Sequence, residues 1–136
     1  MIHISFKICF IISCLLVHCL KANQDQHVTV QCNGAFAIPD SKTGVCQQEI
    51  PKKKKYSCDL SSCSLNSHLW VPMNNCQLFQ SPIKDFSNQQ CREYAWTGYD
   101  YDCINPGTYK YTCPYTPQNI PSMICRYCLE VPLGIL

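Results

Sequence analysis

The sequence predicts a small, disulfide-rich, mainly β fold with one short helix, organised as a single domain. Three observations indicate this fold class. Cysteine is unusually frequent, at 13 of 136 residues. Polar and apolar residues alternate with a period of two in several segments, above all in residues 99–113, and clusters of turn-forming residues separate these segments. A chain of this length forms one domain with a modest core, which disulfides can reinforce.

The N-terminal 22 residues have the features of a secretory signal peptide. Lys7 supplies a positive charge, residues 8–16 are almost wholly apolar, and Ala22 is a small residue suited to cleavage, with cleavage after Cys19 as the alternative. We therefore expect a signal peptide over 1–22, one cysteine-rich domain over 23–136, and a secreted, extracellular product. Because the apolar segment is shorter than the roughly 20 residues of a membrane helix, we expect no integral membrane segment in the mature chain.

Ten cysteines remain after the leader, an even number typical of a disulfide framework in a secreted protein. They allow five bridges, but the sequence leaves the pairing open. The cysteines expected in disulfides are Cys32, Cys46, Cys58, Cys63, Cys76, Cys91, Cys103, Cys113, Cys125 and Cys128.

The first element along the domain is a strand, followed by a loop. In residues 27–32, Val28, Val30 and Cys32 alternate with polar residues, which is the period of a strand with one buried face. Residues 39–44 are dense in turn formers and predict a loop.

The single helix is expected at about residues 88–95. Ser87 followed three positions later by Gln90 has the form of a capping box, and Phe86 is placed to act as a hydrophobic staple at the start of the helix.

Residues 99–113 predict a β-hairpin around the turn at 105–107. A two-residue loop would divide the alternating tyrosines and cysteines between two faces, whereas a three-residue loop places all of them on one face. We expect the second register, which sets Asp102 opposite Lys110 and gives Gly107 the left-handed bulge position.

A faint internal repeat accompanies these elements. Two sets of three cysteines have similar spacing, and in each set a tyrosine lies two positions before the third cysteine. A duplication and chance spacing in so cysteine-rich a chain are both open. The sets are Cys32, Cys46 and Cys58, and Cys91, Cys103 and Cys113.

Enzyme chemistry has little support in the sequence. His27 and His68 are the histidines that follow the leader, and neither belongs to a nucleophile or metalloprotease motif. We therefore expect no enzyme, no catalytic residue and no cofactor.

A metal or redox site is suggested only by cysteine spacing. Cys125 and Cys128 are spaced as in zinc and redox sites, and Cys58 with Cys63 could supply a second pair. Both readings require reduced thiols, whereas the secretory route favours cystines, so we expect no metal.

Candidate contact residues fall in two places. The first is a run of four lysines, which suits a solvated loop, an anionic polysaccharide or lipid contact, a nuclear-import patch or a processing site. The second is the tyrosine-rich last third of the chain, where Tyr94 and Trp96 lie outside the expected hairpin face and suit contact with a protein or a sugar. The lysines are Lys52, Lys53, Lys54 and Lys55.

Charge gives no support for a nucleic-acid partner. Without the leader, the chain has equal numbers of basic and acidic side chains. We expect no nucleic-acid binding.

Tyr-x-Cys steps ending at Cys58, Cys103 and Cys113, together with a signal peptide, dispersed cysteines and no enzyme motif, complete the pattern. In these features the chain resembles the small secreted cysteine-rich proteins of biotrophic, rust-type plant-pathogenic fungi, which are candidate effectors. The resemblance implies a disulfide-stabilised binding protein that acts on a host or neighbouring extracellular protein, with later entry into a host cell as a further option. The alternatives are a disulfide-rich inhibitor or antimicrobial protein that presents the 52–55 loop, and a polysaccharide-binding module.

Overall fold

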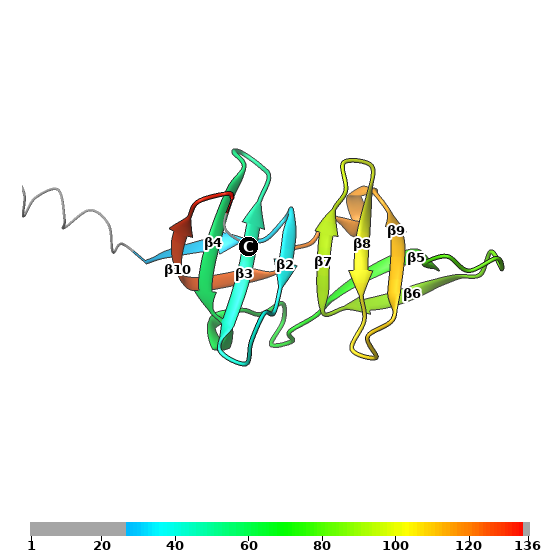
Figure 1. Ribbon diagram of the computed structural model, residues 1–136, viewed down its shortest axis with the longest axis horizontal. Coiled ribbons are helices and arrows are strands. Elements are labelled where there is room, and N and C mark those ends of the chain that lie inside the picture. The colour runs from blue at the N-terminus through cyan, green and yellow to red at the C-terminus, as the bar shows by residue number, and fades with distance from the viewer. Residues whose placement is uncertain (1–26, 135–136) are drawn as a thin grey trace, which may run out of the picture.

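Ten antiparallel strands form one continuous sheet in the computed structural model, which describes residues 27–134 (Figure 1). The expected leader, residues 1–22, lies outside the described residues. Two short 3-10 turns, η1 (Leu60–Ser62) and η2 (Pro117–Asn119), are the helical elements of the described range. The strands are β1 (Val28–Gln31), β2 (Ala35–Ala37), β3 (Thr43–Gln48), β4 (Lys54–Asp59), β5 (Val71–Leu78), β6 (Phe86–Cys91), β7 (Glu93–Trp96), β8 (Asp100–Ile104), β9 (Lys110–Pro114) and β10 (Ile124–Val131).

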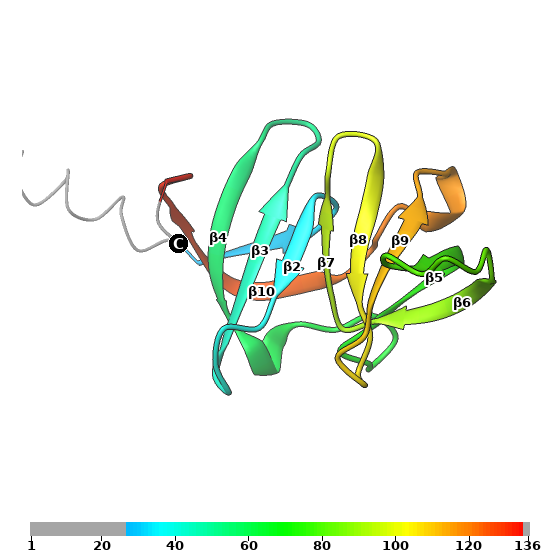
Figure 2. The ribbon, with the colours of Figure 1, turned by 45° about the vertical axis from the view of Figure 1, so that its right-hand side comes forward.

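The order of the strands divides the sheet into two halves. The first half-sheet has the order β1-β10-β4-β3-β2, and the second has the order β7-β8-β9-β5-β6. They join where β2 pairs with β7 and Phe36 lies opposite Tyr94. In the first half-sheet, β1 and β10 cross behind the meander β2-β3-β4, as Figures 1 and 2 both show. Two similar five-stranded halves therefore share one sheet.

Each half-sheet contains one strand exchanged from the other end of the chain. After β4 and η1, the chain crosses to the second half-sheet, where β5 pairs with β9 and β6. After β9 and η2, it returns to the first half-sheet, where β10 pairs with β4 and β1. The fold is thus a structural repeat of β1–β5 and β6–β10 in which the fifth strands are exchanged. The internal repeat suggested by the cysteine spacing is present in the structure.

The predicted fold class is confirmed: a single, mainly β, disulfide-rich domain. The strand expected at 27–32 is β1, in which Val30 is buried, and Cys32 just beyond it is buried as well. Residues 39–42 of the expected loop lie between β2 and β3, whereas Thr43 and Gly44 belong to β3.

The hairpin expected over 99–113 forms from β8 and β9, with the predicted faces but a shifted register. Tyr101 lies opposite Cys113 and Cys103 opposite Tyr111, so the side chains share a face as expected. The loop is longer than three residues, because Ile104 already pairs with Lys110. Asp102 consequently lies opposite Thr112, although the Lys110 ammonium still reaches its carboxylate at 3.0 Å.

The bulge position expected for Gly107 was wrong. Thr108 has the positive φ of this loop, at 67°.

The helix expected at about 88–95 was also wrong. This segment forms the end of β6 and most of β7, separated by Arg92. The Gln89 side chain donates to Ser87 Oγ at 2.8 Å, a contact between residues two apart that lie on the same side of a strand. Pairing of β6 with β5, and a disulfide at Cys91, override the local capping signal.

Cysteines and aromatic residues dominate the core. All ten bridged cysteines are buried, together with Phe36, Tyr94, Tyr101, Met73 and Met123. Valine, leucine and isoleucine contribute little to the core, because Val30 and Val71 are the only residues of these types that are buried within residues 27–134. Covalent bridges therefore supply much of what a larger apolar core would supply.

A candidate binding cleft where the half-sheets meet

All ten cysteines expected in disulfides are bridged. The two sets of the internal repeat occupy matching positions, since the first cysteine of each set bonds to the second and the third bonds to the exchanged strand. None of the five bridges formed in residues 27–134 joins the two half-sheets. The pairs are Cys32–Cys46, Cys58–Cys128, Cys63–Cys125, Cys76–Cys113 and Cys91–Cys103.

The two cysteine pairs considered for a metal site do come together. Cys125 bonds to Cys63, and Cys128 bonds to Cys58. A zinc site requires thiolates, and sulfur atoms joined in cystines do not provide them. This cluster is therefore structural in the oxidised protein.

The four lysines lie between β3 and β4 and on β4 itself. Lys53 is 3.4 Å from a carboxylate oxygen of Glu49, and Lys54 is 2.7 Å from one of Glu130. The bond to Glu130 raises the pKa of Lys54. Lys54 and Lys55 belong to the strand, and Lys52 is exposed. The run is thus partly neutralised rather than a free cationic loop.

The two aromatic contact candidates have different fates. Tyr94 is 4% exposed, and its hydroxyl donates to the Cys32 carbonyl at 2.6 Å. Its expected role as an exposed contact was wrong, because Tyr94 is a core residue that ties the half-sheets together. Trp96, at the end of β7, is 39% exposed.

A cleft of about 210 Å³ contains Trp96 and lies where the half-sheets meet. One wall is aromatic and comes from the second half-sheet. The other combines polar and aliphatic residues from the segments that follow β1, β3 and η2. The lining residues are Trp96, Tyr101 and Tyr115, and Asn33, Glu49, Ile50 and Ile120.

The aromatic wall follows from strand register. Trp96 on β7 lies directly opposite Tyr101 on β8. Tyr115 follows β9, and its ring stacks on Tyr101 with 6.1 Å between centroids and tilts against Trp96 at 6.2 Å. Tyr101 is almost fully buried, whereas Trp96 and Tyr115 are exposed at the surface. The wall therefore has a rigid base and an accessible rim.

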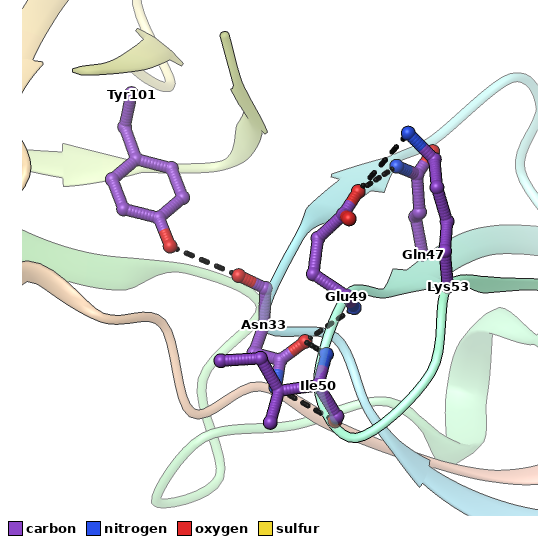
Figure 3. Close-up of polar contacts among 6 residues, drawn as sticks. All are labelled: Asn33, Gln47, Glu49, Ile50, Lys53 and Tyr101. Carbon is purple, nitrogen blue, oxygen red and sulfur yellow. Dashed lines mark hydrogen bonds and ion pairs between the residues drawn. The ribbon is translucent and has the colours of Figure 1, made fainter. Parts of the chain in front are cut away.

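Glu49 supplies the negative charge of the cleft (Figure 3). Its backbone N–H donates to Asn33 Oδ1 at 2.7 Å, and its Oε1 accepts from Gln47 Nε2 and pairs with Lys53. In Figure 3, Gln47 and Lys53 reach the carboxylate from the side away from Tyr101. Within residues 27–134, no group donates a hydrogen bond to Glu49 Oε2. This side chain is only 16% exposed.

Tyr101 connects the aromatic wall to the opposite wall. Its hydroxyl donates to the Asn33 carbonyl at 2.9 Å. Burial raises the pKa of Tyr101 to about 12, with smaller contributions from Tyr115 and Glu49. The hydroxyl is therefore a protonated donor at neutral pH.

Two wider depressions offer less chemistry. One, of about 620 Å³, lies along β1, β4 and β10, and its charged groups Lys54 and Glu130 already pair with each other. The other, of about 510 Å³, is a serine-rich surface beside Arg126 and Tyr127. The smaller junction cleft combines clustered aromatic rings with a carboxylate oxygen, which makes it the best candidate site.

Most of this cleft was missed by sequence reasoning. Tyr101 was expected only as a core residue, and Tyr115 belongs to the tyrosine-rich last third from which it could have been selected. Glu49, Ile50 and Ile120 have no motif or spacing that could have identified them, because only the β2–β7 junction brings them to the aromatic wall.

In the described part of the chain, no helix is long and apolar enough to cross a membrane. The chain matches no family model, and no curated protein or solved structure matches it either. The chemistry of the junction cleft is therefore the basis on which a function can be assigned.

Proposed function

We propose that this protein is a secreted, effector-like binding protein that recognises a host or neighbouring extracellular protein through the junction cleft. The observation that carries this proposal is an aromatic-walled cleft on a scaffold fixed by five disulfides. Exposed tryptophan and tyrosine give large contact area at small entropic cost, and a rigid scaffold reduces the cost of ordering them. The number of disulfides suits an oxidising, extracellular environment.

Binding without chemistry is supported by what lines the cleft. Its one carboxylate, Glu49, has no second carboxylate or histidine beside it among the lining residues. His68 lies elsewhere, on the surface, and its ring stacks on Trp70 with 4.7 Å between centroids. Recognition of a partner surface is the simpler use of such a site.

The two alternatives receive less support. An inhibitor or antimicrobial protein would present its lysine loop freely, but Lys53 and Lys54 are paired with carboxylates. A polysaccharide-binding module could use Trp96 and Tyr115, and sugar binding is therefore an explicit outcome of the experiment below.

The test uses the oxidised protein and a double variant, Trp96→Ala with Tyr115→Ala. Both are immobilised and exposed to extracellular fluid of a candidate host plant. Captured proteins are identified by mass spectrometry, purified and titrated back. We expect the double variant to bind the purified partner at least about tenfold more weakly, as for buried aromatic contact residues in other interfaces.

The matched controls are Tyr109→Ala and Tyr127→Ala, which remove exposed tyrosines elsewhere on the surface. They should bind as the wild type does, and near-ultraviolet circular dichroism should show that every variant is folded. Equal affinity of the wild type and the double variant would contradict the proposal. Sedimentation with chitin or cellulose that depends on Trp96 would favour the polysaccharide alternative instead.

A further inference from the structure

We infer that the junction cleft binds a basic side chain, arginine or lysine, of the partner protein. This inference rests on the proposed function and names the chemistry of recognition at the same site. Two features of the cleft lead to it: the ring faces of one wall, and the carboxylate oxygen of Glu49 that receives no hydrogen bond within residues 27–134.

The aromatic wall favours a cation. Trp96 and Tyr115 expose ring surface at the rim, and a cation placed over such a ring is attracted by its negative face. Ile50 and Ile120 line the same cleft and both expose part of their side chains, so they can pack along the methylene stem of a long basic side chain. The stem and the charged end of one residue thus find matching surfaces.

Glu49 makes the charge of the cleft negative. The Oε1 atom is held by Gln47 and lies 3.4 Å from the Lys53 ammonium, which leaves Oε2 to accept from an incoming group. Lys53 is itself 58% exposed and competes for the same carboxylate. Lys53 does not line the cleft and reaches Glu49 from the side away from Tyr101 (Figure 3), so its charge should weaken binding of a second cation without blocking the cleft.

The size of the cleft favours a side chain over a whole small molecule. A volume of about 210 Å³ is below the roughly 300–1,000 Å³ of typical small-molecule sites. The exposed rim would leave a small cation mostly in water, whereas a side chain presented by a protein surface would be covered by that surface. The occupant is therefore a residue of a protein partner.

The experiment follows the Trp96 indole N–H by nuclear magnetic resonance while the oxidised protein is titrated with small probes. The probes are N-acetyl-arginine amide, N-acetyl-lysine amide, the uncharged arginine analogue N-acetyl-citrulline amide, and methyl β-glucoside. Because the rim is open, binding of these small probes should be weak but saturable, and we expect such shifts with the two cationic probes only. Equal shifts with citrulline or with the glucoside, or no shift with any probe, would overturn the inference.

Charge variants give the sharper test. Glu49→Gln should weaken binding of the arginine probe by about threefold, and Lys53→Gln should strengthen it by a similar factor. The matched controls are Lys54→Gln and Glu130→Gln, which remove the charges of the second ion pair. Because this pair lies outside the cleft, both variants should leave the dissociation constant of the arginine probe unchanged. Insensitivity to Glu49→Gln would count decisively against a cation.

The same variants separate this inference from the proposed function. Binding of a purified partner could depend on Trp96 and Tyr115 but not on Glu49 or Lys53. That result would support the proposed function and overturn the inference that the cleft binds a basic side chain. A partner indifferent to all four positions would remove both.

Discussion

The two half-sheets hold their exchanged strands by different means. In the first, β10 is bonded through two disulfides, to Cys58 on β4 and to Cys63 after η1. In the second, β5 is bonded through one, between Cys76 and Cys113, and Asn119 at the end of η2 takes the place of the other. The Asn119 side chain accepts from the Asn74 N–H at 2.7 Å and donates to the Asn74 carbonyl at 3.0 Å. A buried amide thus performs the role of a covalent bridge.

The meanders of the two half-sheets, β2-β3-β4 and β7-β8-β9, show a related difference. Gly44 lies opposite Cys58 in the first half-sheet, and Tyr101 lies opposite Cys113 at the matching position of the second. A Cβ on Gly44 would be 3.0 Å from Cys63 Sγ, so the additional disulfide covers this position. In the second half-sheet, an aromatic ring fills the corresponding space and lines the cleft. The half with fewer bridges therefore provides the aromatic wall of the cleft.

The largest expected effect comes from removing bridges one at a time. Cys76→Ala with Cys113→Ala opens a loop of sequence separation 37, which should lower the free energy of unfolding by about 3–4 kcal/mol. The two bridges to β10 have separations of 70 and 62 and are nested, so either one alone still closes nearly the same loop. Removing one of them should therefore cost about 1 kcal/mol less, despite its greater separation.

Urea unfolding of the three double variants, monitored by fluorescence, measures this order. Intact mass with and without reduction and alkylation confirms the remaining bridges, and the wild type should weigh ten hydrogens less than its reduced form, two for each of the five bridges. If removing either β10 bridge lowered the free energy of unfolding more than removing Cys76–Cys113, the prediction that the two β10 bridges are redundant would be wrong.

Asn119→Ala should have the next largest effect. Asn119 is 1% exposed, and its loss would leave the Asn74 N–H without its side-chain partner and open a small cavity. We expect a loss of about 2–3 kcal/mol in the free energy of unfolding. The control Asn105→Ala removes an amide that accepts from the Tyr109 N–H in the exposed β8–β9 loop and should cost less than about 1 kcal/mol. Similar losses for both variants would show that Asn119 has no special role in holding β5.

Local sequence patterns predicted the fold class and the faces of the hairpin, because period-two alternation directly encodes which side chains are buried. The helix at 88–95 could not be rejected from the sequence. Ser87 and Gln90 satisfy the rule for a helix start, and only pairing with β5 and the bridge from Cys91 to Cys103 decides for strands. Disulfide pairing was equally out of reach, since the exchange of β5 and β10 joins cysteines that no local pattern connects.

The cleft was less predictable than the fold. Trp96 was selected because tyrosines and tryptophan gather in the last third of the chain, and it lines the cleft. Tyr94, chosen for the same reason, is buried because it faces Phe36 across the β2–β7 junction. Composition identifies which residue types suit contact, whereas the junction decides which of them reach the surface.

Gly44→Ala should show a smaller effect that is specific to the first half-sheet. The new methyl group would lie 3.0 Å from Cys63 Sγ and 3.1 Å from Phe36 Cε2, so buried atoms would have to shift. We expect a loss of about 1–2 kcal/mol in the free energy of unfolding, measured by urea titration. Gly98→Ala is an instructive comparison, since its site is open but has a φ of 103°. Its cost would reflect backbone strain alone. Full stability of Gly44→Ala would mean that the disulfide does not cover this position tightly.

The smallest expected effect tests how the half-sheets are joined. No bridge within residues 27–134 crosses the junction, and Tyr101→Phe removes one of two tyrosine hydroxyls of the second half-sheet that donate to carbonyls preceding β2. The loss in the free energy of unfolding should be about 1 kcal/mol at pH 8. Tyr111→Phe, whose hydroxyl has no hydrogen-bond partner among the described residues, should be nearly neutral.

Burial raises the pKa of Tyr101 from 10.0 to about 12. The stability that this proton provides is therefore fully present below pH 10 and is lost as the pH rises toward 12. Between pH 8 and pH 10.5, the urea midpoint of unfolding should fall further in the wild type than in Tyr101→Phe. Equal falls in the two proteins would show that this hydroxyl does not couple the half-sheets.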